Sequence, residues 1–360
     1  MKKDFIKYFI PIILLCFIGI ISIYCSKSIV NNYMYFFKRQ IIYVVIGIIL
    51  LFFFKCINFN IIYKYSFLIY LFSIFMLVYV LFFGDTINGS KSWINLFGIS
   101  IQPSEFAKIG LLLCLDKYVK SKYGFIKSIV LLLVPSILTF LQPDTGTVLF
   151  YLVIYFSIFI CMGLKKKYYV SLFSLCFIGI GIFVYLYFFN SDLFIKIFGT
   201  NFFYRIDRVI NFTKNEGYQI NNALIGIGNG GVMGNLSKYV IYIPEAITDF
   251  MFANVLTMFG FVGGVVVVSL FLIIDIMLVR DIFKLNKHKY YVIGLFGLFL
   301  YQQVQHIFMD IGLLPITGIT LPFVSYGGSS LISYFILFGI LFNLKKKNSL
   351  NFWLWFIYML

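Results

Sequence analysis

Residues 66–83 read SFLIYLFSIFMLVYVLFF, an apolar run that contains no charged side chain. About 18 such residues are enough for a helix that crosses the hydrocarbon core of a bilayer. Runs of the same kind recur along the chain, and the two shorter ones can extend into their flanks. The predicted spans lie near 8–25, 41–54, 66–83, 105–116, 128–141, 146–164, 168–189, 250–278, 290–309 and 328–343. The sequence therefore predicts an all-α integral membrane protein with about ten transmembrane helices.

The composition of the whole chain supports this fold class. Of its 360 residues, 62% are hydrophobic and only 12% are charged, and the mean hydropathy is +0.98. Soluble domains have about 45–50% apolar and about 25% charged residues, so soluble enzymes, secreted domains and disordered scaffolds are excluded. The six cysteines form no CxxC pair and lie in or beside apolar runs. They are therefore expected to be small packing residues within helices.

Basic residues are distributed unevenly between the loops. If the N-terminus lies in the cytoplasm, most of the 29 lysines and arginines fall in inner segments and most of the 13 acids outside, as the positive-inside rule requires. This N-in/C-in topology accounts for the net charge of +16, so the charge indicates no nucleic-acid partner. We expect one polytopic domain over 1–347 with a large extracytoplasmic loop at 190–249, followed by a hydrophobic tail at 348–360 of unknown role.

The outer stretch 84–108 carries ionisable residues where a span begins. Trp93 is expected at the level of the lipid headgroups. Pro103 opens a helix, and Glu105 and Lys108, three residues apart, project from one face of it. The pair is either a snorkelling pair at the interface or part of a polar cavity, because charged residues within spans are costly and usually line cavities.

A further carboxylate lies in a very short outer connection. Gln142-Pro143-Asp144-Thr145-Gly146 links two spans with almost no loop between them. Asp144 either caps the helix that follows or joins Lys108 in a shared cavity on the outer side.

The long outer loop contains two of the chain's four arginines. Arg205 and Arg208 are three residues apart, so they lie on one side of a helix. Because arginine binds phosphate through two parallel hydrogen bonds, these residues are candidates for binding an anionic headgroup. The alternative is that they only anchor the loop at the membrane interface.

The same loop ends in a glycine-rich stretch and an aspartate. Residues 226–231 match the pattern GxGxxG, and Asp249 follows about 20 residues later, as in dinucleotide-binding proteins. No βαβ unit surrounds the match, so we reject that interpretation and expect a mobile glycine loop over an active site. Asp249 lies at the start of a span, where a partly desolvated carboxylate can have a raised pKa and accept a proton. Alternatively, its charge complements the helix dipole.

The segment 312–330, GLLPITGITLPFVSYGGSS, cannot form one continuous helix. Irregular backbone at membrane depth is tolerated only where it is buried in protein or lines a wet cavity. Segments of this kind mark binding sites in transporters, so a transporter stays an alternative. Just before this segment, His306 and Asp310 share a helix face. Two such ligands without a third make a weak metal site.

These outer segments together resemble the SEDS family (shape, elongation, division and sporulation), the group of RodA and FtsW. The matching strings are Asn88–Ile94, Gln102–Glu105 with Lys108, Gln142–Gly146, Tyr204–Ile206, Gly217–Gln219, Pro244–Glu245, Thr248–Phe250, Gly312–Pro315, Thr317–Gly318 and Leu321–Ser330. Trp93 and Ser325 lie within these strings, and we include both among the substrate-binding candidates. The short chain favours a RodA-like member.

The resemblance implies a function. Members polymerise lipid II into glycan strands on the outer face of the bacterial cytoplasmic membrane, beside a class B penicillin-binding protein that crosslinks the product. An elongation or division complex and the membrane lipids are the further partners implied. The family's essential loop aspartate corresponds to Asp249, its cavity carboxylate and lysine to Glu105 and Lys108, and its Gln-x-Asp motif to Asp144.

This chemistry suits the residue types. A sugar 4-hydroxyl attacks the anomeric carbon of a second lipid-linked sugar while pyrophosphate leaves, so a carboxylate base and positive charge at the leaving group are needed. We assign Asp249 as the base and Arg205, Arg208 and Lys108 as phosphate partners. A divalent cation could share the last role.

The chain also departs from the family pattern. The differing positions are Thr257, Met258, Asn222, Ala223, His306 and Thr320, and they leave an inactive paralogue conceivable. Two other function classes stay open: a translocator (flippase) of lipid-linked precursor, and a scaffold that only holds its transpeptidase.

Overall fold

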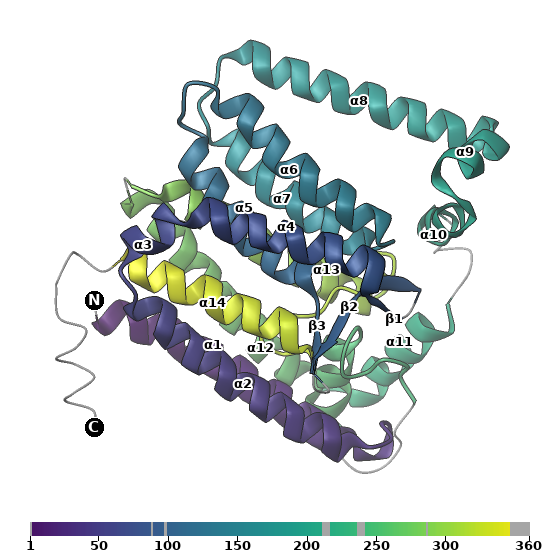
Figure 1. Ribbon diagram of the computed structural model, residues 1–360. Coiled ribbons are helices and arrows are strands. Elements are labelled where there is room, and N and C mark those ends of the chain that lie inside the picture. Colours follow the sequence, from purple (N-terminus) through teal and green to yellow (C-terminus); the bar gives the residue numbers. More distant parts are fainter. Residues whose placement is uncertain are drawn as a thin grey trace.

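The computed structural model describes residues 2–87, 89–96, 99–210, 217–235, 242–285 and 287–345. Each of the ten predicted spans coincides with a helix (Figure 1). These helices are α1 (Lys2–Cys25), α2 (Tyr33–Cys56), α4 (Ser66–Phe83), α5 (Pro103–Tyr118), α6 (Gly124–Leu141), α7 (Thr145–Ile160), α8 (Lys166–Phe189), α12 (Met251–Lys284), α13 (Lys289–Asp310) and α14 (Gly328–Leu344). The shorter helices are η1 (Ser26–Ser28), α3 (Phe59–Lys64), α9 (Ser191–Phe198), α10 (Thr200–Ile210) and α11 (Tyr218–Gly230).

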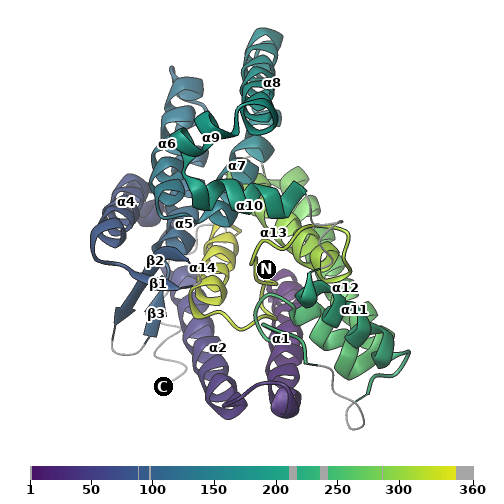
Figure 2. The same ribbon diagram turned by 90° about the vertical axis from the view of Figure 1, so that its right-hand side faces the viewer.

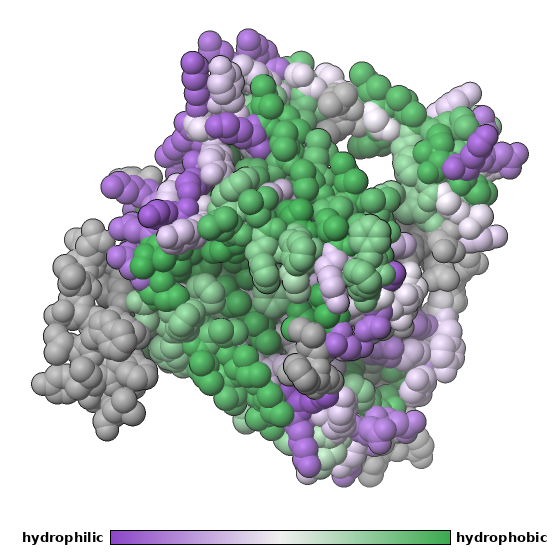
Figure 3. Space-filling model, in the orientation of Figure 1, coloured by the Kyte–Doolittle hydropathy of each residue, from purple (hydrophilic) through white to green (hydrophobic). Residues whose placement is uncertain are grey.

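Several of these helices have the length and composition of membrane spans. Among the described residues, 7 helices are long and apolar enough to cross a bilayer, and α7 and α14 are shorter apolar helices. Hydrophobic side chains cover the middle of the face in Figure 3, and hydrophilic ones gather toward the two ends of the helices. This distribution fits a molecule whose middle contacts lipid.

The helix α14 lies at the centre of the bundle and packs against α2, α5 and α13 (Figure 1). Small residues allow the closest approach: Gly47 of α2 faces the ring of Phe335, and Gly339 of α14 faces the backbone of Leu51. Such contacts matter in a bilayer, where helix association depends on close packing. The aromatic rings of Phe299, Phe323, Tyr334 and Phe338 pack together at the same depth.

A small antiparallel sheet lies between α4 and α5, in the outer stretch for which the sequence predicts no strand. Its strands are β1 (Asp85–Ile87), β2 (Ser90–Leu96) and β3 (Ile99–Ile101), in the order β1-β2-β3. Ile94 pairs with Ile101 across β2 and β3, and the amide of Asn95 donates to the carboxylate of Asp85 over 2.8 Å. The hydroxyl of Ser90 donates to the carbonyl of Pro143 over 2.9 Å, and this hydrogen bond connects the sheet to the Asp144 turn.

The span predicted over 250–278 coincides with α12, which contains a kink that the sequence did not predict. Gly260 has φ 67° and ψ −169° inside α12, a conformation that only glycine adopts without strain. The chain therefore forms a short helical segment before Gly260 and a long one after it. The end of α11 stabilises the kink, because the amides of Phe261 and Val262 donate to the carbonyls of Gly231 and Val232.

The expectation of a mobile glycine loop at 226–231 was wrong. Gly226 and Gly230 lie within α11 and are buried, and both face residues of α12. A side chain at Gly230 would collide with the backbone carbonyl of Leu256. Glycine is required here for close packing of two helices, not for motion.

The helices α8, α9 and α10 form a separate group (Figures 1 and 2). Their aromatic rings pack on one another, with Phe194 of α9 contacting Phe183 and Phe202. Phe202 also meets Phe140 of α6 at 5.1 Å between ring centroids, and this contact joins the group to the bundle. Most of α8 is exposed, as expected for a helix that faces lipid.

Candidate functional site

The start of α5 carries a closed ion pair. Pro103 occupies the first turn, where its missing N–H leaves no helical hydrogen bond unmade. One turn later, Nζ of Lys108 lies 2.6 Å from Oε2 of Glu105, and the two side chains are 0% and 4% exposed. The pair is therefore enclosed within the bundle, and the interpretation as a snorkelling pair at the interface was wrong.

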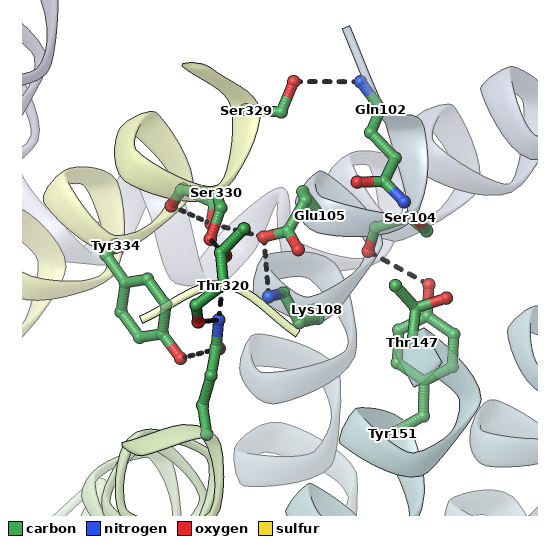
Figure 4. A network of polar contacts seen from close by, with 12 residues as sticks. Gln102, Ser104, Glu105, Lys108, Thr147, Tyr151, Thr320, Ser329, Ser330 and Tyr334 are labelled. Carbon is green, nitrogen blue, oxygen red and sulfur yellow. Dashed lines mark hydrogen bonds and ion pairs between the residues drawn. The ribbon is translucent and has the colours of Figure 1, made fainter. Parts of the chain in front are cut away.

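Residues of other helices complete this enclosure (Figure 4). Ser333 of α14 donates a hydrogen bond of 2.9 Å to Oε2 of Glu105. The rings of Phe150 and Tyr334 lie 4.5 and 5.4 Å from Nζ of Lys108, which allows cation–π attraction. A buried ion pair is tolerated only with such additional partners.

A hydrogen-bond network extends from this pair toward the irregular segment after α13. The hydroxyl of Tyr334 donates to Oε1 of Gln302 over 2.5 Å. Nε2 of Gln302 donates to the carbonyl of Thr320 over 2.7 Å, and Oγ1 of Thr320 donates to Oγ of Ser330 over 3.1 Å. These contacts hold the irregular backbone against α13 and α14 (Figure 4), as non-helical backbone at membrane depth requires.

Asp144 performs the capping role that was one of its two predicted alternatives. Its Oδ1 accepts from the backbone N–H of Thr147 over 3.3 Å at the start of α7. Its Oδ2 accepts from Nε2 of Gln102 over 2.8 Å, and Gln102 directly precedes α5. Burial raises the pKa of Asp144, although the hydrogen bonds from Thr147 and Gln102 oppose this shift. Asp144 is thus joined to the Glu105 end of α5 through Gln102.

The second centre is the turn that carries Asp249, just before α12. Oγ of Ser325 donates to the carbonyl of Thr248 over 2.8 Å and accepts from the N–H of Leu321 over 2.9 Å. The N–H of Tyr326 donates to the carbonyl of Ile247 over 2.8 Å. Ser325 therefore fastens the irregular segment to the Asp249 turn. Its hydroxyl is used for this contact, so its predicted role in binding substrate stays a proposal.

The carboxyl group of Asp249 differs from the two described above. Its side chain is partly buried, and burial, with a smaller effect from the negative charge of Glu245, raises the pKa of Asp249 to about 6. A carboxyl group with such a pKa is mostly ionised at neutral pH and can still take up a proton readily.

The irregular segment 311–327 lies between the two centres. A β-carbon on Gly146, next to the Asp144 turn, would stand 3.4 Å from the carbonyl oxygen of Thr317. A β-carbon on Gly318, the residue after Thr317, would stand 3.7 Å from Oδ2 of Asp249. Gly318 has φ 69°, which favours glycine. One short piece of backbone therefore lies beside both the Asp144 turn and Asp249.

For the remaining predicted site residues, the structure describes no contact with Glu105, Asp144 or Asp249. Trp93 lies in β2 opposite Asp85 and is partly exposed. Arg205 and Arg208 lie in α10, but their side chains are outside the described residues.

The departures from the family pattern fill space between helices. Ala223 and Met258 are buried in one apolar cluster, and Oγ1 of Thr257 donates to the carbonyl of Ala253 over 2.8 Å. The tail at 348–360 lies outside the described residues.

Sequence reasoning missed several residues that build the site. Gln102, Gln302, Ser333 and Tyr334 all contact the two centres or their connecting network. A polar residue within an apolar run was the available signal, but the chain abounds in tyrosine and serine. Ser333 and Glu105 are 228 residues apart, so their contact could not be read from spacing.

Comparisons with known proteins agree with this architecture. The family model for cell cycle proteins of the FtsW, RodA and SpoVE type matches residues 5–350. The probable peptidoglycan glycosyltransferase FtsW of Wigglesworthia glossinidia brevipalpis is 32% identical, over 97% of this chain and 94% of that protein. Stage V sporulation protein E of Bacillus subtilis is 30% identical, over 96% of this chain and 98% of that protein.

Solved structures share the fold. A chain from a study of polymerization and crosslinking by a peptidoglycan synthase complex has a TM-score of 0.78 at 23% identity, covering 94% of this chain and 96% of that one. The rod shape determining protein RodA of Thermus thermophilus has a TM-score of 0.69 at 24% identity, with the same coverage. This chain is thus a multi-pass helical membrane protein that belongs to the FtsW/RodA/SpoVE family.

Proposed function

We propose that this chain is a peptidoglycan glycosyltransferase that polymerises lipid II into glycan strands on the outer face of the bacterial cytoplasmic membrane. Relatives named as peptidoglycan glycosyltransferases support the activity. The observation that carries the proposal is the partly buried Asp249, whose pKa is raised to about 6 beside the irregular segment. A carboxylate in this position is a suitable general base.

In the proposed reaction, Asp249 takes the proton from the 4-hydroxyl of the acceptor sugar. The oxygen then bonds to the anomeric carbon of the donor, and the bond from that carbon to the lipid pyrophosphate breaks. With a pKa of about 6, about nine-tenths of Asp249 is ionised at pH 7 and ready to accept the proton. The departing pyrophosphate needs positive charge.

The other site residues have supporting roles in this proposal. Arg205 and Arg208 bind the pyrophosphate from α10, and Trp93 contacts the lipid-linked substrate at the headgroup level. Lys108 is already neutralised by Glu105 over 2.6 Å, so with Asp144 it shapes the floor of the site and meets phosphate only when the pair opens.

A divalent cation would be held mainly by pyrophosphate oxygens and one carboxylate. No cluster of three or more His, Cys, Asp or Glu side chains occurs among the residues that the structure describes, and no step above is assigned to a cation. The partner that we propose is a class B penicillin-binding protein, within an elongation or division complex and surrounded by membrane lipids.

A translocator of lipid-linked precursor is the second candidate function. The polar network of Gln302, Tyr334 and Thr320 inside the bundle favours it, because polar groups at membrane depth often line transport routes.

The decisive experiment uses purified protein with lipid II. The Asp249→Asn variant should bind lipid II but form glycan strands about 10²–10⁴-fold more slowly. Unchanged polymerisation by this variant would show that Asp249 is not the base. Transfer of labelled precursor across protein-containing vesicles without strand growth would favour the translocator. Failure of both assays, with a transpeptidase still bound, would indicate a scaffold.

A further inference from the structure

A buried histidine next to the Asp249 turn contacts two separate parts of the chain. His306, near the end of α13, is fully buried. Its Nδ1 lies 2.7 Å from the carbonyl oxygen of Ile319 in the irregular segment. Its Nε2 lies 3.4 Å from the backbone nitrogen of Phe252 in the first turn of α12. His306 therefore bridges the two backbone segments that flank Asp249.

These contacts define the tautomer of the imidazole. A carbonyl oxygen can only accept, so Nδ1 carries the proton; a backbone N–H can only donate, so Nε2 presents its lone pair. Both nitrogens are thereby used for backbone contacts. The weak metal site considered from the sequence would require Nε2 to leave Phe252.

Asp310, one helical turn further along α13, makes a matching contact. Its Oδ2 accepts from the backbone N–H of Ala253 over 2.8 Å and lies 3.4 Å from Nε2 of His306. The residue is fully buried, and its Oδ1 has no hydrogen-bond partner among the described residues. Asp310 thus binds one of the N–H groups that α12 leaves unpaired at its start.

We infer that His306 and Asp310 are positioning residues that fix Asp249 relative to the irregular segment. Phe252 and Ala253 follow Asp249 by three and four residues, and Ile319 follows Gly318, which faces Oδ2 of Asp249. Because α13 holds the backbone of Phe252, Ala253 and Ile319, it fixes the position of the Asp249 carboxylate relative to both α12 and the irregular segment. This inference rests on the proposed function, in which Asp249 is the base.

Among the described residues, the titratable groups that act on Asp249 are Glu245 in its own turn and Asp310 in α13. Gly318 of the irregular segment contributes only backbone. If the contacts made by His306 and Asp310 are lost, the start of α12 loosens and Asp249 becomes more exposed to water. The pKa of Asp249, which burial raises to about 6, should then fall.

The same two helices provide a matched control. Nε2 of Gln303, on α13, donates to Oδ1 of Asp275, on α12, over 3.0 Å, and both side chains are buried. This pair joins α12 to α13 as His306 and Asp310 do, but it contacts neither the Asp249 turn nor the irregular segment through these atoms. Gln303→Leu therefore measures the general effect of losing a buried polar contact between the helices.

The test compares purified full-length variants in glycan synthesis from lipid II across a pH series, with thermal unfolding in detergent measured in parallel. His306→Phe keeps a ring of similar size but loses both backbone contacts, and Asp310→Leu loses the contact to Ala253. Each should lower kcat by about 10²-fold, because small displacements of a catalytic group have effects of this size. KM should change little. The fall in rate at low pH, which is the acid limb of the pH profile, should move below pH 6.

Two controls make the expected result specific. Asp310→Asn retains an oxygen that can accept from Ala253, so it should restore nearly wild-type kcat. Gln303→Leu should lower the unfolding temperature but leave kcat and the acid limb unchanged.

Several outcomes would overturn the inference. One is that His306→Phe and Asp310→Leu behave like Gln303→Leu, with lower stability but normal kcat and acid limb. Another is that Asp310→Asn loses as much activity as Asp310→Leu, because the accepting oxygen would then not be what matters. If His306→Phe does not fold, the comparison of Asp310→Leu with Asp310→Asn decides whether the inference holds. Normal polymerisation by Asp249→Asn would refute the proposed function instead, and these results can be told apart.

Discussion

The Glu105–Lys108 pair and the Asp249 turn lie on either side of the irregular segment, yet their carboxylates have neighbours of opposite charge. Glu105 is buried with a cation at 2.6 Å and a hydroxyl donor at 2.9 Å. Asp249 is partly buried with another carboxylate, Glu245, as its charged neighbour. The first arrangement neutralises a charge inside the bundle, and the second leaves a carboxylate with an affinity for protons. The contrast indicates that one centre supports the fold and the other carries the chemistry.

Breaking the closed pair should have the largest effect on stability. Lys108→Met leaves Glu105 buried without its cation, which should lower the free energy of unfolding by about 3–5 kcal/mol. Unfolding of the purified protein in mixed micelles with denaturant measures this. The double variant Glu105→Gln/Lys108→Met should recover most of the loss, because an uncharged replacement of a buried pair is often tolerated. Wild-type stability in Lys108→Met alone would contradict a closed pair.

Removing the charge of Asp249 should increase stability, in contrast to the loss expected for Lys108→Met. Because burial raises the pKa of Asp249 from about 3.8 to about 6, ionisation of this group opposes folding. The favourable contribution of protonated Asp249 is complete below pH 4 and is lost as the pH rises through 6. Asp249→Asn should therefore raise the free energy of unfolding by up to about 3 kcal/mol at pH 8, because one pKa unit corresponds to about 1.4 kcal/mol.

The same unfolding assay at pH 4 and pH 8 tests this sign. The gain should vanish at pH 4, where Asp249 of the wild type is protonated in the folded protein. An equal gain at both pH values would show that the effect does not come from the charge of Asp249.

The contact between Asp144 and the Glu105 end of α5 gives a smaller expected effect. Asp144→Ala removes the cap of α7 and the acceptor for Gln102, so the free energy of unfolding should fall by about 1–2 kcal/mol. Asp144→Asn retains an acceptor for Thr147 and should lose less. Thermal unfolding of both variants checks the order, and equal stability of Asp144→Ala and wild type would show that the cap contributes nothing.

The sequence predicted the two centres unequally well. Apolar runs located the spans, and the spacing of Glu105 and Lys108 placed them on one helix face, because helix periodicity is a local property. The break of α12 at Gly260 was not predicted, since it depends on α11 packing against the end of the first segment. Nor could spacing show that Ser333 reaches Glu105 or that His306 reaches Phe252, because these contacts join residues far apart in the chain.

The smallest expected effect concerns the charge beside Asp249 itself. The negative charge of Glu245 contributes to the raised pKa of Asp249, although less than burial does. Glu245→Gln removes that charge, so the pKa of Asp249 should fall, by less than about one unit because Glu245 is exposed and screened by water.

The acid limb of glycan synthesis should then move to lower pH, with a higher rate than wild type near pH 5 and an equal rate near pH 8. Glutamine retains an oxygen that can accept from the hydroxyl of Thr248, which now donates to Glu245 over 2.7 Å, so the turn keeps this contact. A shift of the acid limb to higher pH, or a loss of rate at every pH, would mean that Glu245 acts through the conformation of the turn. An unchanged pH profile of Gln303→Leu in the same series shows that the shift comes from the Asp249 turn and not from the packing of α12 against α13.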